Sequence, residues 1–531
     1  MRGSDTARKI GGRRRGLRTV TLTSVFASLA LFGMNCPESP VLYAATCERD
    51  ITPVSPGLVS AYEAAFGGTA VVNHSDPVFL AGFGDDRRAT GYHDQLWARG
   101  VVLQGAGGRV AIVALDLVGY FNKEIQTIRS LVDPASGIDH VVVHSTHQHE
   151  GPDTLGIWGP DPLTPGVDPG YLDFVNDAVA SCIDEAAAQL GPARVKFATT
   201  DSVGLSLGLD AEDDGDGVSD GKVLVDDDLI APATDGRITD PRLSIMQVTR
   251  RAPPYRVLAT LVNFASHPES LGSNNTLVTS DFPHFARETI EASEGGLAIW
   301  VSGDLGVLQG PLDIDVLDPL TNAPAVRRSF RWAEVHGQQL GERVVGAIPG
   351  MPGNPLATID FASVPTVPVR LDNPFFRFFI ALGVLPNLLF TDGAPDDSVG
   401  FPFPPPFDPI PQALGEDLHT EVSAFRINEA SFAVVPTELD PQIGEVYREA
   451  MAGAEHTFII GLGNDEIGYQ LPAPKWDDSC HACAPYILAG AVAACPFFPP
   501  DCNTVFQNNV GADVDPSVSG AMLPLLSSLH D

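Results

Sequence analysis

A run of three valines that leads into closely spaced histidines limits where residues 141–152 can lie in a fold. The segment reads Val-Val-Val-His-Ser-Thr-His-Gln-His-Glu-Gly-Pro. The valines predict a buried strand, and the Gly-Pro pair predicts its end. Residues two apart in an extended chain point to one face, so His147 and His149 are placed to bind one metal ion. His144 lies an odd number of residues from both and is expected to point the other way.

Two other strand-like runs end in a potential metal ligand. The run 261–267 (Leu-Val-Asn-Phe-Ala-Ser-His) ends in His267, and the run 432–438 (Phe-Ala-Val-Val-Pro-Thr-Glu) ends in Glu438 after a turn. Three imidazoles and one carboxylate suit zinc, which in catalytic sites keeps one position open for water. The sequence therefore predicts a zinc site that these two residues complete.

Strand-like and helix-like segments alternate along residues 60–350, which indicates a mixed α/β fold. A strand pattern resumes after Thr420, so we expect one large domain over residues 46–531, with mixed β-sheets flanked by helices and a cysteine-rich tail at 480–502. The predicted strands include 101–103, 110–115, 141–143 and 258–262, and the predicted helices include 171–190 and 325–348.

An acidic insertion occupies residues 210–228. Within it, the segment 212–220 spaces its carboxylates and a glycine as a calcium-binding loop does, but Val223 stands where the loop's last acidic ligand belongs. The segment is either an external Ca²⁺ site or a solvated acidic loop. Both interpretations place it away from the chemistry.

A second insertion, residues 372–415, is first apolar and then rich in proline. Its segment 374–382 has four phenylalanines within five residues, which predicts a helix that is apolar on every face. Such a helix is either buried in the core or forms an exposed lip that receives an acyl chain or makes transient contact with a membrane surface.

The amino-terminal residues 1–45 are typical of a secretory signal. A cluster of arginines at 13–15 and 18 precedes an apolar run from Val20 to Met34, and small residues at 42–45 suit a cleavage site. The run is short for a membrane span. We therefore expect a secreted or periplasmic protein, and a lipid anchor at Cys36 is disfavoured.

The cysteine content indicates the redox compartment of the protein, and its charge excludes one class of partner. Removal of the signal leaves six cysteines, an even number that favours disulfide bonds in an oxidising compartment over a zinc ribbon at Cys480 and Cys483. The chain has 32 basic and 67 acidic residues, and the resulting net charge of −35 would repel nucleic acid. No protein partner is implied.

Motifs along the chain resemble, in order, those of the neutral, non-lysosomal ceramidases. The segment 146–152, Thr-His-Gln-His-Glu-Gly-Pro, is similar to the family's Thr-His-Thr-His-Ser-Gly-Pro, and the resemblance spans about residues 50–475. The other segments similar to family motifs are 82–84 (Gly-Phe-Gly), 90–99 (Thr-Gly-Tyr-His-Asp-Gln-Leu-Trp-Ala-Arg), 240–244 (Asp-Pro-Arg-Leu-Ser), 263–267 (Asn-Phe-Ala-Ser-His), 436–438 (Pro-Thr-Glu) and 464–469 (Asn-Asp-Glu-Ile-Gly-Tyr).

This resemblance implies a zinc amidase that cleaves the amide bond of ceramide (N-acyl sphingosine) or a related acyl amide with a metal-activated water. It implies that His93 contacts the substrate or the oxyanion, and that Tyr469 binds at or beside the metal and stabilises the tetrahedral intermediate. The implied zinc ligands are His147, His149, His267, Glu438 and Tyr469.

Three departures from the family pattern concern the substrate. Glu150 replaces a small serine and would act as a general base or orient a ligand. Gln309 stands where the family carries a serine implicated in catalysis, and the chain ends too early for the family's C-terminal immunoglobulin-like domain. Two alternatives therefore stay open: a zinc hydrolase of a non-sphingolipid amide or ester, and a non-catalytic secreted protein that metal ions stabilise.

Overall fold

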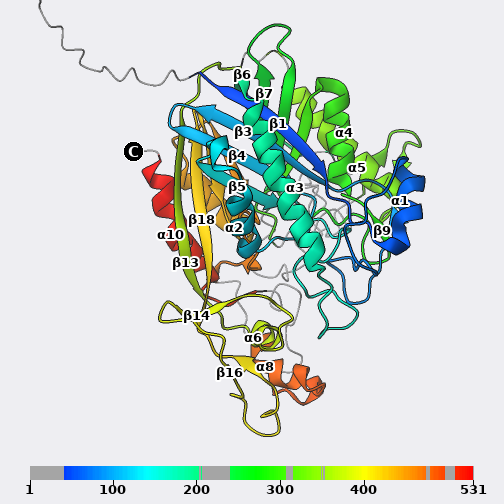
Figure 1. Ribbon diagram of the computed structural model, residues 1–531, viewed down its shortest axis with the longest axis vertical. Helices are drawn as coiled ribbons and strands as arrows, with labels where there is room; N and C mark the ends of the chain where they lie inside the picture. Colours follow the sequence, from blue (N-terminus) through cyan, green and yellow to red (C-terminus); the bar gives the residue numbers. More distant parts are fainter. Residues whose placement is uncertain are drawn as a thin grey trace, which may run out of the picture. The chain divides into compact units, whose positions relative to one another are not determined.

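The computed structural model describes residues 41–202, 205, 239–306, 315–348, 350, 353–473, 479–496 and 509–529 (Figure 1). Several sequence predictions fall outside these residues. They are most of the predicted signal, the segment 212–220 proposed to bind Ca²⁺, Gln309 and Cys502.

The larger sheet has eight strands and places the first strand of the domain at its centre. Its order is β10-β8-β7-β6-β1-β3-β4-β5, with β4 parallel to β5, β8 parallel to β10 and the other pairs antiparallel. The strands are β1 (Tyr43–Asp50), β3 (Trp97–Gly105), β4 (Gly108–Leu115), β5 (His140–Ser145), β6 (Gly191–Asp201), β7 (Arg242–Arg250), β8 (Val257–Phe264) and β10 (Leu297–Ser302).

A six-stranded sheet packs against one face of the larger sheet. Its order is β15-β14-β18-β19-β21, and β13 pairs with β18. The strands are β13 (Ile359–Arg370), β14 (Leu389–Thr391), β15 (Ala394–Pro395), β18 (Asp417–Ile427), β19 (Ala430–Val434) and β21 (His456–Ile460). Short pairs join β2 (Gly91–Tyr92) to β9 (Leu277–Val278), β11 (Leu317–Asp318) to β12 (Ala323–Pro324), β16 (Val399–Gly400) to β17 (Gln412–Ala413) and β20 (Glu438–Leu439) to β22 (Tyr469–Gln470).

Alternation along the strands sends successive side chains into different cores, as the period of two residues requires. Val142 enters the core between the two sheets together with Phe432, whereas Val141 and Val143 enter the core beneath α2 and α3. Ala433 faces away from the larger sheet, toward α7 and α10. The result is a helix, sheet, sheet, helix arrangement, which confirms the predicted mixed α/β class.

The helices cover the two outer faces of the paired sheets. In Figure 1, α3 crosses β1 and β3, while α10 lies beside β13 and β18. The α-helices are α1 (Val59–Phe66), α2 (Asn122–Leu131), α3 (Pro169–Ala188), α4 (Phe282–Glu294), α5 (Phe330–Ala347), α6 (Pro374–Ala381), α7 (Pro441–Ala450), α8 (Ser479–Leu488) and α10 (Val514–Ser528). None of the helices within the described ranges is long and apolar enough to cross a membrane.

Two disulfide bonds confirm the expected use of the cysteines. Cys47 on β1 is bonded to Cys182 on α3, and Cys483 is bonded to Cys495 in the tail. Cys480 is also disulfide-bonded. Because Cys480 and Cys483 each take part in a disulfide bond, neither offers a thiolate to a zinc ribbon.

Polar side chains join the carboxyl ends of strands that are far apart in the larger sheet. The His144 ring at the end of β5 contacts the Gly461 carbonyl through Nδ1 (2.7 Å) and accepts from Ser302 N of β10 at Nε2 (3.1 Å). Asn263 of β8 donates to the carbonyls of Val301 and Ile459. These bonds bring the ends of β5, β8, β10 and β21 to one place.

His336 on α5 is a buried imidazole that the fold keeps neutral. Neither ring nitrogen has a hydrogen-bond partner among the described residues, and the ring packs 4.6 Å from that of Phe282 on α4. Burial lowers the pKa of His336 from 6.5 to about 3. Unfolding restores the ordinary pKa, so the stabilisation from the neutral form is complete above about pH 6.5 and is lost as the pH falls toward 3.

We predict that His336→Leu makes the protein more resistant to acid. As the pH falls from 6 to 4, the wild type should lose about 1.4 kcal/mol of unfolding free energy per pH unit relative to the variant, since the leucine takes up no proton. Urea unfolding at a series of pH values measures this difference. Above pH 7 the two curves should differ by a constant, and curves that stay parallel down to pH 4 would contradict the prediction.

Candidate metal centre

The structure brings three predicted ligands into one buried cluster. His147, His149 and His267 each offer a ring nitrogen, and these atoms all lie within 4.8 Å of one another. It is the only group of this kind within the described ranges. His147 and His149 follow β5, and His267 follows β8, so the cluster forms where the carboxyl ends of the strands meet.

The sequence predicted that His147 and His149 lie on an extended strand, and this prediction was wrong. β5 ends at Ser145, and His147 has a φ of 65°, the left-handed region that costs energy for a residue with a side chain. Gln148 supports the turn because its amide donates to the Asp116 carbonyl (2.9 Å) and accepts from Glu150 N (2.7 Å). The two rings do come together, as expected, but a turn brings them together rather than the alternation of side chains along a strand.

Glu438 and Tyr469 reach the cluster from the β20–β22 pair. Glu438 is the register partner of Tyr469 in this parallel pair. The Glu438 Oε2 atom lies 3.0 Å from His267 Nε2 and 3.4 Å from His147 Nε2. The Tyr469 hydroxyl donates to Glu438. Burial opposes ionisation, but the pKa of Glu438 is lowered by His147 and His267, so Glu438 is a carboxylate.

The donor set fits a zinc ion. The His147 Nδ1 atom contacts the Val118 carbonyl at 2.5 Å, which leaves Nε2 to face Glu438 and the cluster. Both ring nitrogens of His149 are buried without a hydrogen-bond partner among the described residues, an arrangement that a bound cation would relieve. Imidazoles with one carboxylate are ligands that zinc prefers.

A narrow cavity of about 80 Å³ opens at the cluster, and its lining is mostly apolar. His147, His149, Glu438 and Tyr469 line one part of it. The apolar lining includes Phe121, Leu155, Trp158, Phe376, Ile380 and Leu385. A second cavity of about 830 Å³ shares Phe121, Leu155, Asn387 and Leu418 with the first.

Helix α6 of the second insertion forms part of the cavity wall. Only Phe375 of this helix is fully buried, while Phe376 and Ile380 are half-buried and line the cavity. The helix is therefore neither a core helix nor a free lip. It contacts β17 and α8, and Figure 1 shows it grouped with β14, β16 and α8.

Two solved structures share this arrangement of strands and helices. Neutral ceramidase from Pseudomonas aeruginosa matches with a TM-score of 0.59 and 17% identity over 85% of this chain and 73% of that chain. The protein has the neutral ceramidase fold. A structure described as ceramidase complexed with C2 matches with a TM-score of 0.57 and 16% identity over 89% of this chain and 76% of that chain. No protein-family model and no curated protein matches the sequence.

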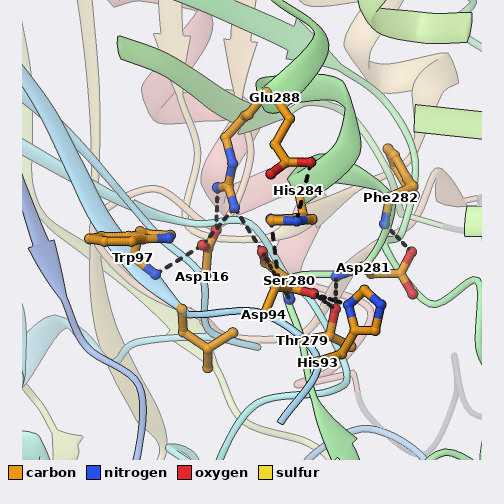
Figure 2. Close-up of polar contacts among 12 residues, drawn as sticks. His93, Asp94, Trp97, Asp116, Thr279, Ser280, Asp281, Phe282, His284 and Glu288 are labelled. Atoms are coloured by element: carbon orange, nitrogen blue, oxygen red, sulfur yellow. Dashed lines mark hydrogen bonds and ion pairs between the residues drawn. The ribbon is translucent and has the colours of Figure 1, made fainter. Parts of the chain in front are cut away.

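Within this ceramidase fold, His93 lies apart from the residues that line the cavity. Figure 2 shows it in a polar network with Asp94, Thr279 and Ser280. The His93 Nδ1 atom lies 2.9 Å from Asp94 Oδ2, and its ring stacks on Phe330. The network reaches the turn that carries His147 and His149 because Thr279 N donates to the Glu150 carbonyl (3.3 Å). The structure thus relates His93 to the site through Asp94 and Thr279.

Glu150 points away from the cavity, toward Arg87. Its Oε2 atom accepts from Arg87 Nη1 at 2.9 Å, and the same guanidinium donates to the carbonyls of His149 and Ala81. Burial raises the pKa of Glu150 to about 8, although Arg87 opposes the shift. Of the two roles left open for Glu150, the orientation of a ligand fits this position, since Arg87 joins it to the backbone of His149.

Sequence reasoning missed two buried carboxylates at the cluster. Glu269 Oε2 lies 3.2 Å from His149 Nδ1, and Glu466 lines the cavity beside Tyr469. Glu269 follows His267 by two residues, the same spacing that singled out His147 and His149, so this signal was present in the sequence. Ser302, which stands close to the missing family serine in sequence, donates to the Thr146 carbonyl and has a structural role.

Gly82 is required for the position of His149. Its φ is +101°, and a Cβ there would overlap the His149 ring. We predict that Gly82→Ala displaces this ring and lowers zinc affinity by roughly 10-fold or more, because a ligand forced off its geometry binds poorly. Competition with a chromophoric chelator measures the affinity.

Gly84→Ala is the matched control. Gly84 also has a positive φ, but a Cβ there meets nothing within 4 Å. This variant carries the backbone strain without the clash and should bind zinc as the wild type does. Equal losses of affinity in both variants would show that strain, rather than the contact with His149, is responsible.

Proposed function

We propose that the protein is an exported zinc-dependent amidohydrolase that cleaves an N-acyl amide, with ceramide as the first candidate substrate. The observation that carries this proposal is the convergence of three histidines and Glu438 at one end of an apolar cavity. Structural zinc sites are closed, whereas catalytic sites stay open to a substrate. The cavity at the cluster therefore favours an enzyme over a protein that metal ions only stabilise.

The residues of the cavity have the properties that amide hydrolysis requires. Zinc, when bound by the histidines and Glu438, supplies the Lewis acid that activates water near neutral pH. The Tyr469 hydroxyl can turn from Glu438 to the carbonyl oxygen of a bound amide and stabilise the charge that develops there. Burial and Glu438 raise the pKa of Glu466, so this neutral acid can hydrogen-bond a polar group of the substrate.

The apolar wall matches an acyl chain. Phe376, Ile380 and Leu385 of the second insertion line the cavity together with Leu155 and Trp158, and an alkyl chain bound there would be removed from water. Ceramide has such a chain on its amide. A non-sphingolipid amide or an ester with an apolar acyl group satisfies the same wall and is the alternative substrate.

We predict that His147→Ala loses both zinc and hydrolysis while the protein stays folded. Activity should fall by roughly 100-fold or more, because one of the ligands is gone. Metal analysis of the purified protein and assays on ceramides of several chain lengths, beside N-acyl amino acids and esters, give the readouts.

His140→Ala provides the control, since His140 begins the same strand and stacks on Phe361 away from the cluster. It should keep both zinc and activity. If the purified wild-type protein contains no zinc, the proposal is rejected both for ceramide and for the other amides or esters. Activity on the other amides or esters alone would reject ceramide and keep the hydrolase.

A lipid surface is the proposed source of the substrate. Three exposed apolar side chains, Val399, Phe401 and Leu414, lie in or directly beside the β16–β17 pair of the insertion that supplies α6. The net charge of −35 disfavours anionic lipids, so we expect contact with a zwitterionic surface.

Replacement of Val399, Phe401 and Leu414 by serine should lower binding to phosphatidylcholine vesicles several-fold, because apolar area no longer enters the interface. Hydrolysis of a water-soluble short-chain amide should not change. Leu320→Ser is the control, because Leu320 is even more exposed but lies on the β11–β12 hairpin. Vesicle sedimentation measures the bound fraction, and equal binding of all three proteins would contradict the lipid contact.

Export is proposed from the predicted signal and is consistent with the disulfide bonds. Cleavage after Ala45 would remove the first three residues of β1, in which Ala44 and Ala45 are buried. We therefore infer that the signal is cut upstream of Tyr43. The amino-terminal sequence of the exported protein tests this position.

A further inference from the structure

The second cavity adjoins the one at the histidine cluster and has no role in the function proposed above. It holds about 830 Å³, whereas the cavity at the cluster holds about 80 Å³. Pockets that bind organic ligands are usually about 300 to 1,000 Å³ in volume. A substrate that reaches the cluster therefore extends beyond the smaller cavity. The larger one is next to it, because Phe121, Leu155, Asn387 and Leu418 line both.

Segments that are far apart in the chain enclose the second cavity. Its lining includes residues of the first turns of α2 and α3, the start of β18 and the segment 383–390 that follows α6. A Cβ at Gly156 would lie 2.6 Å from the Val384 carbonyl oxygen, so the segment 383–390 approaches the turn at 156 closely. The same insertion therefore contributes a wall to both cavities.

The lining of the second cavity is mixed, unlike the apolar wall that α6 provides in the first. Asn387 is the one polar residue among the four that line both cavities, and its side chain has no hydrogen-bond partner among the described residues. An acyl chain carries no polar atom beyond its carbonyl group and would leave such side chains unpaired. The polar residues of the lining are Asn122, Lys123, Glu124, Thr154, Asp173, Asn387, His419 and Asp465.

The shape of an amide requires space on two sides of the scissile bond. A secondary amide is planar and strongly prefers the trans form, so the acyl chain and the group on nitrogen leave the bond in opposite directions. If the acyl chain lies beside α6, the group on nitrogen needs another space of its own. The second cavity is the larger space that adjoins the cluster.

We propose that the second cavity receives the group on the amine side of the amide, with Asn387 as a hydrogen-bond partner where the two cavities meet. This inference rests on the proposed function, since it requires an amide at the histidine cluster. Hydrolysis breaks the C–N bond: water gives its hydroxyl group to the acyl carbon and a proton to nitrogen, and the new acid passes its proton to the amine. Three carboxylates and one lysine line the second cavity, so it favours the cationic amine over the anionic acid.

Two series of water-soluble amides test which group each cavity holds. One series keeps a hexanoyl group and varies the amine from methylamine through butylamine to hexylamine; the other keeps methylamine and varies the acyl group. In the wild type, kcat/KM should rise by roughly 10-fold or more along the amine series, because each buried methylene favours binding. Values of kcat/KM that do not change along the amine series would overturn the inference.

Leu388→Trp reduces the space in the second cavity alone, since Leu388 lines that cavity and not the other. The gain along the amine series should shrink by roughly 5-fold, while the dependence on acyl length stays that of the wild type. Leu382→Trp is the matched control, because Leu382 is similarly exposed in the same insertion and lines neither cavity. It should keep the gain of the wild type along both series.

Leu172→Trp on α3 repeats the test from another wall of the second cavity. If both tryptophan variants keep the full gain along the amine series, or if they penalise long acyl groups instead, the inference is overturned and the hydrolase remains. If the zinc-loaded wild type cleaves no amide of either series, both the proposed function and the role of the second cavity are overturned.

Discussion

The histidine cluster depends on the ring of His144, which lies outside the cluster and ties three strand ends together. Its Nδ1 atom donates to the Gly461 carbonyl after β21, and its Nε2 atom accepts from Ser302 N at the end of β10. Burial lowers the pKa of His144 to about 4, so the ring is neutral at pH 7 and can both donate and accept. With the end of β5 fixed, the turn that follows it brings His147 and His149 close to His267, which follows β8.

Much of the fold and the ligand set could be predicted because both follow from local patterns. The apolar runs at 101–103, 110–115, 141–143 and 258–262 all lie inside strands, since their residues fill cores on both faces of a sheet. His147, His149, His267 and Glu438 were predicted from one rule, that polar residues after buried strands meet at the strand ends. The structure brings these four side chains together.

What the sequence could not predict depends on partners that are distant in the chain. The turn at His147 is held by contacts to Leu117 and Val118, and nothing local to 141–152 signals a left-handed residue there. Glu150 interacts with Arg87, 63 residues earlier. His144 lies outside the cluster of the other three histidines, and its structural role could not be predicted without the positions of β10 and β21. Glu269 was the exception, because its spacing from His267 was visible in the sequence.

The wall that α6 builds against the cavity comes from a different part of the chain than the ligands do. The ligands lie on turns that the two packed sheets hold rigid, while Phe376 and Ile380 belong to an insertion attached to the edge of the six-stranded sheet. Mutations that lengthen, shorten or repack the insertion would alter the shape of the cavity and leave the histidine cluster in place. Selection can therefore change which molecules this cavity admits without rebuilding the cluster of histidines at its end.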